Sequence, residues 1–131
     1  MRKIIVILFM LIGAFSCKKE TYTEVANVNE DKTNLLIGKW TVSYVDIGFT
    51  QTVGDQVLFN SDGTLAIIYK TSNRTGWWKI TDNTITSDRI YNSITANSSD
   101  ITSYTIEKIT SNELILATSK INVIYKIKFI K

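Results

Sequence analysis

The stretch that decides the fold is QVLFNSDGTLAIIYKT, residues 56–71. Two runs of apolar and β-branched side chains flank Ser61-Asp62-Gly63, a tripeptide whose residue types favour a tight turn. The pattern predicts a β-hairpin with strands at Gln56–Asn60 and Thr64–Thr71. Alternate positions of the second strand share one face: Leu65, Ile67 and Tyr69.

The chain beyond residue 35 repeats this pattern of short apolar runs separated by polar turns. It contains no proline, so Gly, Asn, Asp and Ser must form the turns. Residues from Ile90 to Asp100 are rich in Ser, Asn and Thr, and we expect a loop there with room for one extra strand pairing. Six further strands are expected at Gly38–Ile47, Gly76–Ile80, Thr84–Asp88, Tyr104–Ile109, Glu113–Thr118 and Ile121–Ile130.

Sequential antiparallel strands without crossover helices leave two open edges unless the sheet closes on itself. The expected fold is therefore all-β, an eight-stranded antiparallel up-and-down β-barrel. A β-sandwich built from the same strands is the structural alternative. Either fold forms a single domain, which we expect to cover residues 35–131.

The large aromatic side chains indicate where the interior lies. Adjacent residues of a strand face opposite sides, so we expect Trp78 inside and Trp77 outside, where Trp77 could contact a partner. An eight-stranded barrel is wide enough either to be filled by side chains or to hold one small ligand. Seven aromatic residues are expected inside, as packing or as the lining of a pocket for an apolar ligand: Trp40, Tyr44, Phe59, Trp78, Tyr104, Tyr125 and Phe129.

The N-terminus has the features of a bacterial lipoprotein signal. Arg2 and Lys3 precede an apolar run from Ile4 to Ala14. A helix of about eleven residues spans about 16 Å, against roughly 30 Å for a bilayer core, so this run is too short for a permanent anchor. The small residue Ser16 precedes Cys17, the only cysteine of the chain.

We therefore expect residues 1–16 to be a signal peptide and Cys17 to be the lipid-modified first residue of the mature protein. Several acyl chains would hold it stably at a membrane. Lys18 at the second mature position resembles the sorting signals that favour the outer membrane, with the periplasmic face and the cell surface both left open. Residues 21–34 are polar and lack periodicity, so the segment 17–34 is expected to be a flexible tether.

Composition argues against several classes of function. The chain has no histidine, and its single cysteine is assigned to the lipid, so we expect neither a thiol nucleophile nor a disulfide. Loss of the signal peptide would leave 13 basic and 12 acidic residues with scattered lysines, which does not favour nucleic-acid binding. No spacing singles out a pair of carboxylates for acid–base catalysis. We expect no enzyme activity, no metal and no cofactor.

Three motifs follow one another along the domain: LIGKW at residues 36–40, VLFNSDGT at residues 57–64 and GWWKI at residues 76–80. Their order and spacing resemble the short lipocalin-like domain family of bacterial lipoproteins, from Leu35 to Lys131. The resemblance implies that Trp40 closes the barrel floor and that a short helical turn at residues 34–36 leads into the first strand. Many lipocalins place an Arg across this Trp, whereas the late basic residues here are Lys126, Lys128 and Lys131.

Two functions follow as hypotheses. The first is an outer-membrane-anchored lipoprotein that binds a small apolar ligand, with a barrel mouth near Val45–Gly54 and Ile90–Asp100. The second is a structural or interaction module of the cell envelope, with a filled barrel whose outer face or loops bind another envelope protein. A cavity of about 300 Å³ or more would favour the first. A filled interior with an exposed apolar patch that includes Trp77 would favour the second.

Overall fold

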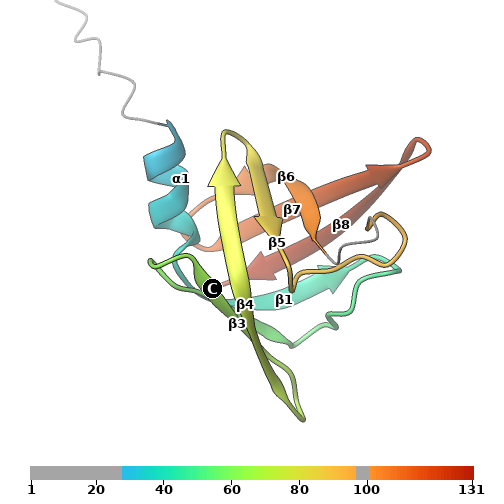
Figure 1. Ribbon diagram of the computed structural model, residues 1–131, viewed down its shortest axis with the longest axis horizontal. Helices are drawn as coiled ribbons and strands as arrows, with labels where there is room; N and C mark the ends of the chain where they lie inside the picture. The colour runs from blue at the N-terminus through green and yellow to red at the C-terminus, as the bar shows by residue number, and fades with distance from the viewer. Residues whose placement is uncertain (1–27, 97–100) are drawn as a thin grey trace, which may run out of the picture.

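The computed structural model describes residues 28–96 and 101–131 and places one helix before a closed sheet of eight strands (Figure 1). The predicted signal peptide and Cys17 lie outside the described residues. The helix α1 spans Val28–Leu36. The strands are β1 (Gly38–Val45), β2 (Gln56–Phe59), β3 (Thr64–Ile68), β4 (Asn73–Thr81), β5 (Thr84–Ser87), β6 (Thr102–Ile109), β7 (Glu113–Lys120) and β8 (Val123–Ile130).

The sheet closes because its first and last strands pair with each other. β1 runs antiparallel to β8, from Thr41 opposite Ile130 to Val45 opposite Ile127. The other pairings join strands that follow one another in the chain. The prediction of an eight-stranded antiparallel up-and-down barrel is confirmed, and the β-sandwich alternative is wrong. Closure also removes the open strand edges at which sheets of different chains pair.

The two ends of the barrel differ in what covers them. The end that we call the floor contains the start of β1, the turns after β2, β4 and β6, and the end of β8. The opposite end, the mouth, is formed by residues 46–55, 69–72, 88–96 and 121–122. In Figure 1, α1 lies at the floor and the turn between β7 and β8 projects from the mouth.

The turn after β2 shows why this stretch forms a hairpin. The Asp62 carboxylate accepts hydrogen bonds from the Thr64 hydroxyl at 2.6 Å and from the Thr64 backbone N–H at 2.9 Å. These bonds favour the ionised carboxylate and lower the pKa of Asp62. Gly63 has a φ of +82°, which glycine adopts without strain. The predicted hairpin is confirmed, although β3 ends at Ile68 rather than Thr71.

The interior of the barrel is one hydrophobic core to which all eight strands contribute. Every second side chain of a strand points inward. Trp78 is buried, whereas its neighbour Trp77 is 38% exposed, so the predicted orientation of these two residues is confirmed. The largest fully buried side chains of the strands are Trp40, Phe59, Leu65, Ile67, Ile85, Tyr104, Leu114, Leu116, Ile127 and Phe129, and Leu36 and Ile90 join them from outside the sheet.

The floor is closed by contacts among the end of α1, Trp40 and Lys131. The Trp40 indole N–H donates to the Leu36 carbonyl at 2.7 Å. The Lys131 ammonium lies 4.6 Å from the centre of the Trp40 ring and donates to the carbonyls of Leu35 and Ile37 at 3.0 and 3.1 Å. The last turn of α1 has no basic residue of its own, so Lys131 supplies the cation that a helix C-terminus favours. Lys131 thus lies across Trp40, where the family resemblance implies an Arg.

Two of the seven aromatic residues expected inside lie elsewhere, and those two predictions are wrong. The pairing of β1 with β8 shifts register between Val42 and Tyr44. This bulge turns Tyr44 outward, where it is 46% exposed and its hydroxyl donates to Asp46. β8 begins at Val123, but its pairing with β1 reaches only to Ile127. Tyr125 therefore pairs only with β7, is half-buried and does not join the core.

The segment before β1 also differs from its prediction. The sequence predicts a flexible tether through Asn34, but α1 begins at Val28, so the prediction is wrong for residues 28–34. An isolated helix of this length is marginal in water and needs tertiary contacts. Leu36 supplies one in the core, and the Lys32 ammonium supplies another by donating to the Asn83 side chain, after β4, at 2.9 Å.

The contacts of the floor predict a large difference between two tryptophan variants. Trp40→Ala should lower the free energy of unfolding by about 3–5 kcal/mol, because it leaves a cavity where a buried indole contacts the core. Trp77→Ala is the matched control on the outer face and should change the free energy of unfolding by at most about 0.5 kcal/mol. Urea denaturation compared at equal slope measures both. A nearly neutral Trp40→Ala would contradict the role of Trp40 in closing the floor.

Candidate binding site at the barrel mouth

The interior aromatic residues pack against protein rather than around a space. The rings of Phe59 and Trp78 meet edge to face with centroids 5.6 Å apart. The Trp78 indole N–H lies 3.1 Å from the Asn60 carbonyl and 3.0 Å from the Thr64 carbonyl, so its one donor is used within the protein. The candidate residues that do lie in the core are Trp40, Phe59, Trp78, Tyr104 and Phe129. Their packing favours a filled barrel over an interior ligand pocket.

Two segments cross the mouth and cover the core at that end. Phe49, between β1 and β2, stacks on Tyr104 with ring centroids 5.9 Å apart. The Tyr104 hydroxyl donates to the carbonyl of the buried Ile90 at 2.8 Å, and burial raises the pKa of Tyr104, which keeps this donor protonated. Within the described part of residues 90–100, the extra strand pairing is limited to one bridge between Phe49 and Asn92.

A hollow of about 250 Å³ lies at the mouth, outside the core. The sequence places residues 45–54 and 90–100 near the mouth, and each of these segments contributes one side chain to the hollow. Small-molecule sites usually have volumes of about 300–1,000 Å³, so this hollow is smaller than that range and would suit only a ligand of a few heavy atoms or part of a larger one. Its lining consists of Thr50, Tyr69, Arg74, Asp88, Arg89 and Tyr91.

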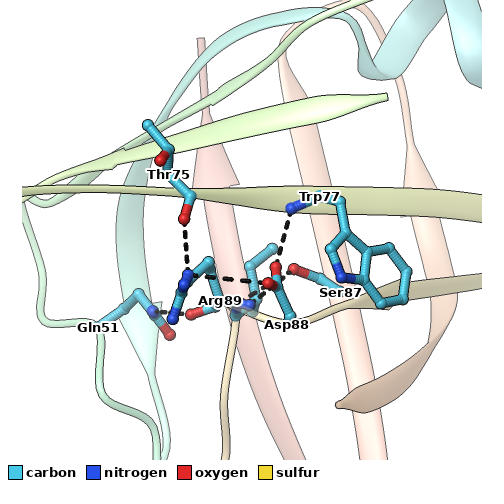
Figure 2. Close-up of polar contacts among 7 residues, drawn as sticks. Gln51, Thr75, Trp77, Ser87, Asp88 and Arg89 are labelled. Atoms are coloured by element: carbon cyan, nitrogen blue, oxygen red, sulfur yellow. Dashed lines mark hydrogen bonds and ion pairs between the residues drawn. The ribbon is translucent and has the colours of Figure 1, made fainter. Parts of the chain in front are cut away.

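One wall of the hollow depends on the absence of a side chain at Gly76. After the end of β5, Asp88 and Arg89 pass against β4 (Figure 2). A Cβ atom on Gly76 would lie 2.2 Å from side-chain atoms of both residues. The Asp88 carboxylate accepts the Trp77 backbone N–H at 2.8 Å, and Arg89 Nε donates to the Thr75 carbonyl at 2.7 Å. These bonds fasten the start of the β5–β6 segment to the edge of β4.

Two buried polar side chains complete this arrangement, and neither is predicted as a site residue from the sequence. The Ser87 hydroxyl accepts the backbone N–H groups of Arg89 at 3.1 Å and of Ile90 at 3.3 Å. Gln51, only 1% exposed, donates from Nε2 to the Arg89 carbonyl at 2.9 Å and to the Tyr69 hydroxyl at 3.4 Å. Gln51 therefore bonds the β1–β2 segment to the segment after β5, at Arg89, and to the β3–β4 turn, at Tyr69. Gly76, within the GWWKI motif, is the sequence feature that could have indicated this site.

Two other hollows lie on the outside of the barrel wall. One, of about 330 Å³, lies over β6, β7 and β8 among small hydroxyl side chains, and its Glu107 carboxylate is paired with Lys126 at 2.8 Å. The other, of about 260 Å³, lies between Ile47 and the start of β8. Across residues 28–96 and 101–131, no three His, Cys, Asp or Glu side chains gather as a metal site. No helix of that part of the chain combines the length and apolar character needed to cross a bilayer.

The barrel is similar to a solved structure from the genus Bacteroides. A lipocalin-like protein from Bacteroides uniformis matches with a TM-score of 0.52 and 14% sequence identity, over 74% of this chain and 98% of that one. The fold is lipocalin-like. An uncharacterized protein from Bacteroides eggerthii matches with a TM-score of 0.45 and 14% identity, over 71% of this chain and 98% of that one. No family model matches this chain, and no curated protein does.

The lipocalin-like barrel confirms the fold that the three sequence motifs imply. At 14% identity, the likeness extends to fold and carries no information on ligand or activity. The motif LIGKW supplies Trp40 at the floor, and the motif GWWKI supplies Gly76 beneath the mouth hollow.

We expect Gly76→Ala to disturb the mouth hollow. The added methyl group would overlap Asp88 and Arg89 and push the crossing segment away, which should lower the free energy of unfolding by about 1–3 kcal/mol. Thr75→Ala, at an exposed neighbouring position of β4, is the control and should stay within about 0.5 kcal/mol of the parent protein. Urea denaturation measures both. Equal stability of the two variants would show that Asp88 and Arg89 do not depend on the space beside Gly76.

Proposed function

We propose that this protein is a lipid-anchored binding protein of the bacterial envelope that holds a small molecule in the hollow at its mouth. One observation carries the proposal: Thr50, Tyr69 and Tyr91 come from three different mouth segments and line one hollow outside a packed core. A carrier that encloses an apolar ligand would need interior space, which the core side chains occupy. The proposed activity is binding, without catalysis and without a cofactor.

The proposed ligand should be lost when a wall of the hollow is removed. Native mass spectrometry of the protein purified in a nonionic detergent should detect a bound small molecule, and Tyr91→Ala should abolish that additional mass. Tyr44→Ala is the matched control, because Tyr44 is an exposed tyrosine that does not line the hollow. Retention of the molecule by Tyr91→Ala, or its absence from the parent protein, would contradict a ligand at the mouth.

The proposed membrane attachment rests on the N-terminal sequence. A basic start, an apolar run of signal-peptide length and a small residue directly before Cys17 form the pattern at which lipid is attached. Ten residues separate Cys17 from the start of α1 at Val28. Fully extended, they would span at most about 36 Å, so an anchored barrel would stay close to the membrane surface. Lys18 favours the outer membrane as the location.

Cys17→Ser should give a protein that carries no lipid and does not sediment with membranes. Ser16→Ala keeps a small residue before the cysteine and should still be modified, so it controls for general damage to the signal. Metabolic labelling with radioactive palmitate, followed by membrane fractionation, distinguishes the two variants. Label on the Cys17→Ser protein would rule out this lipid attachment.

An exposed aliphatic surface favours docking onto another envelope protein as a second candidate function. Ile121, at the projecting β7–β8 turn, is 86% exposed, and Val123 and Ile124 beside it are also exposed. Ile121 has a φ of +50°, an unfavourable conformation for a β-branched residue. Trp77, which the sequence predicts as part of such a patch, pairs with Thr64 near the floor, so it lies away from this hairpin tip. Under this second function, Tyr91→Ala would leave partner binding unchanged.

A further inference from the structure

The geometry of the mouth hollow points to the chemical class of its ligand. We propose that Arg74 and Arg89 bind an oxyanion there, the carboxylate or phosphate group of a small water-soluble organic molecule. This inference rests on the proposed function of the hollow as a ligand site. It goes further by naming the group that the site recognises and the two side chains that bind it.

Arg74 is an exposed cation near the mouth end of β4. It pairs directly with Ile67 of β3, and directly opposed residues of an antiparallel pair extend to the same face of the sheet. Ile67 is fully buried in the core, so Arg74 extends from the same face of the sheet, but it lies at the mouth end of β4, where it is exposed to solvent and lines the hollow. Within residues 28–96 and 101–131, the Arg74 side chain has no hydrogen bond and no ion pair. Its charge is therefore available to a ligand.

Arg89 is held by one edge of its guanidinium group. Its Nε donates to the Thr75 carbonyl at 2.7 Å, and its carbonyl accepts from the buried Gln51, so both the side chain and the backbone are fastened (Figure 2). Asp88 lies 3.9 Å from the same Nε, and its carboxylate already accepts the Trp77 N–H. The terminal nitrogens of Arg89 have no hydrogen-bond partner in the described part of the chain. A held guanidinium with free donors binds an oxyanion at a low cost in side-chain entropy.

The lining of the hollow is rich in donors and poor in acceptors. Two guanidinium groups face one carboxylate, which leaves an excess of one positive charge. The Tyr69 hydroxyl accepts from Gln51 and keeps its own proton for donation, and Tyr91 and Thr50 add two more hydroxyl groups. Guanidinium groups match carboxylate and phosphate with paired, charge-assisted hydrogen bonds. The tyrosine rings offer flat apolar surface to the organic part of the ligand.

The test is a titration of the full isotopically labelled chain in a nonionic detergent, followed by amide NMR at low salt. The probes are benzoate, phenyl phosphate and their neutral analogue benzyl alcohol. Both anions should shift the amides of Tyr69, Arg89 and Tyr91, and benzyl alcohol should not. Arg74→Gln should raise the apparent dissociation constant of the anions by at least about tenfold, the loss expected for a charge-assisted hydrogen bond. Lys79→Gln, an exposed cation of the same strand outside the hollow, should leave it unchanged.

The outcomes separate this inference from the proposed function. Binding of both anions at the hollow, without binding of benzyl alcohol, supports the inference. The anion with the lower dissociation constant then indicates whether the ligand carries a carboxylate or a phosphate ester. Shifts at the hollow that are equal for benzyl alcohol and the anions overturn the anion class but keep a ligand site at the mouth. Anion shifts that spread over surface lysines, or that are equal in Arg74→Gln and Lys79→Gln, overturn the role of Arg74. If none of the probes shifts these amides, the inference fails, and if native mass spectrometry also finds no bound molecule, the proposed function fails with it.

Discussion

The hydrogen-bonded ladder between β1 and β8 joins the two ends of the sheet, and most of the architecture is a consequence of that closure. With eight strands, a closed sheet encloses a space about as wide as the side chains that point into it. Trp40, Phe59, Tyr104 and Phe129 occupy that space, and the indole and hydroxyl groups among them bond to backbone carbonyls. Closure therefore gives the protein a solid core and leaves recognition to its ends and outer surface.

At both ends of the barrel, side chains form hydrogen bonds with backbone groups, but the backbone groups that need partners differ. At the floor, helix carbonyls need partners, and Trp40 and Lys131 supply them from β1 and from the residue after β8. At the mouth, the polar backbone groups of the connecting segments need hydrogen-bond partners where these segments cover the core. Gln51 and Ser87 supply such partners. The mouth also brings two guanidinium groups to one hollow, those of Arg74 and Arg89, and the proposed binding site lies there.

Local patterns in the sequence were sufficient for much of the fold. The alternation of Trp77 and Trp78 and the turn at Asp62-Gly63 depend on neighbouring residues, so period and turn chemistry predict them. Tyr44 could not be placed in this way, because a register shift against β8 reverses its orientation, and nothing in the alternation of β1 itself indicates the shift. Tyr125 shares the limitation: whether β8 still faces the core there depends on where β1 stops. The hollow combines Arg74 with Arg89 through the space beside Gly76, a contact between segments that sequence spacing does not show.

The even number of strands has a consequence for how such a protein can change over evolution. An up-and-down barrel of eight strands begins and ends at the same pole, so both Gly38 and Ile130 lie at the floor. Four connecting segments are thereby gathered at the opposite pole, away from the helix and from the end of the last strand. Connecting segments generally tolerate changes in length and composition better than the strands that they join. The same eight strands can thus carry connecting segments of different sequence at one pole, while the floor keeps its contacts.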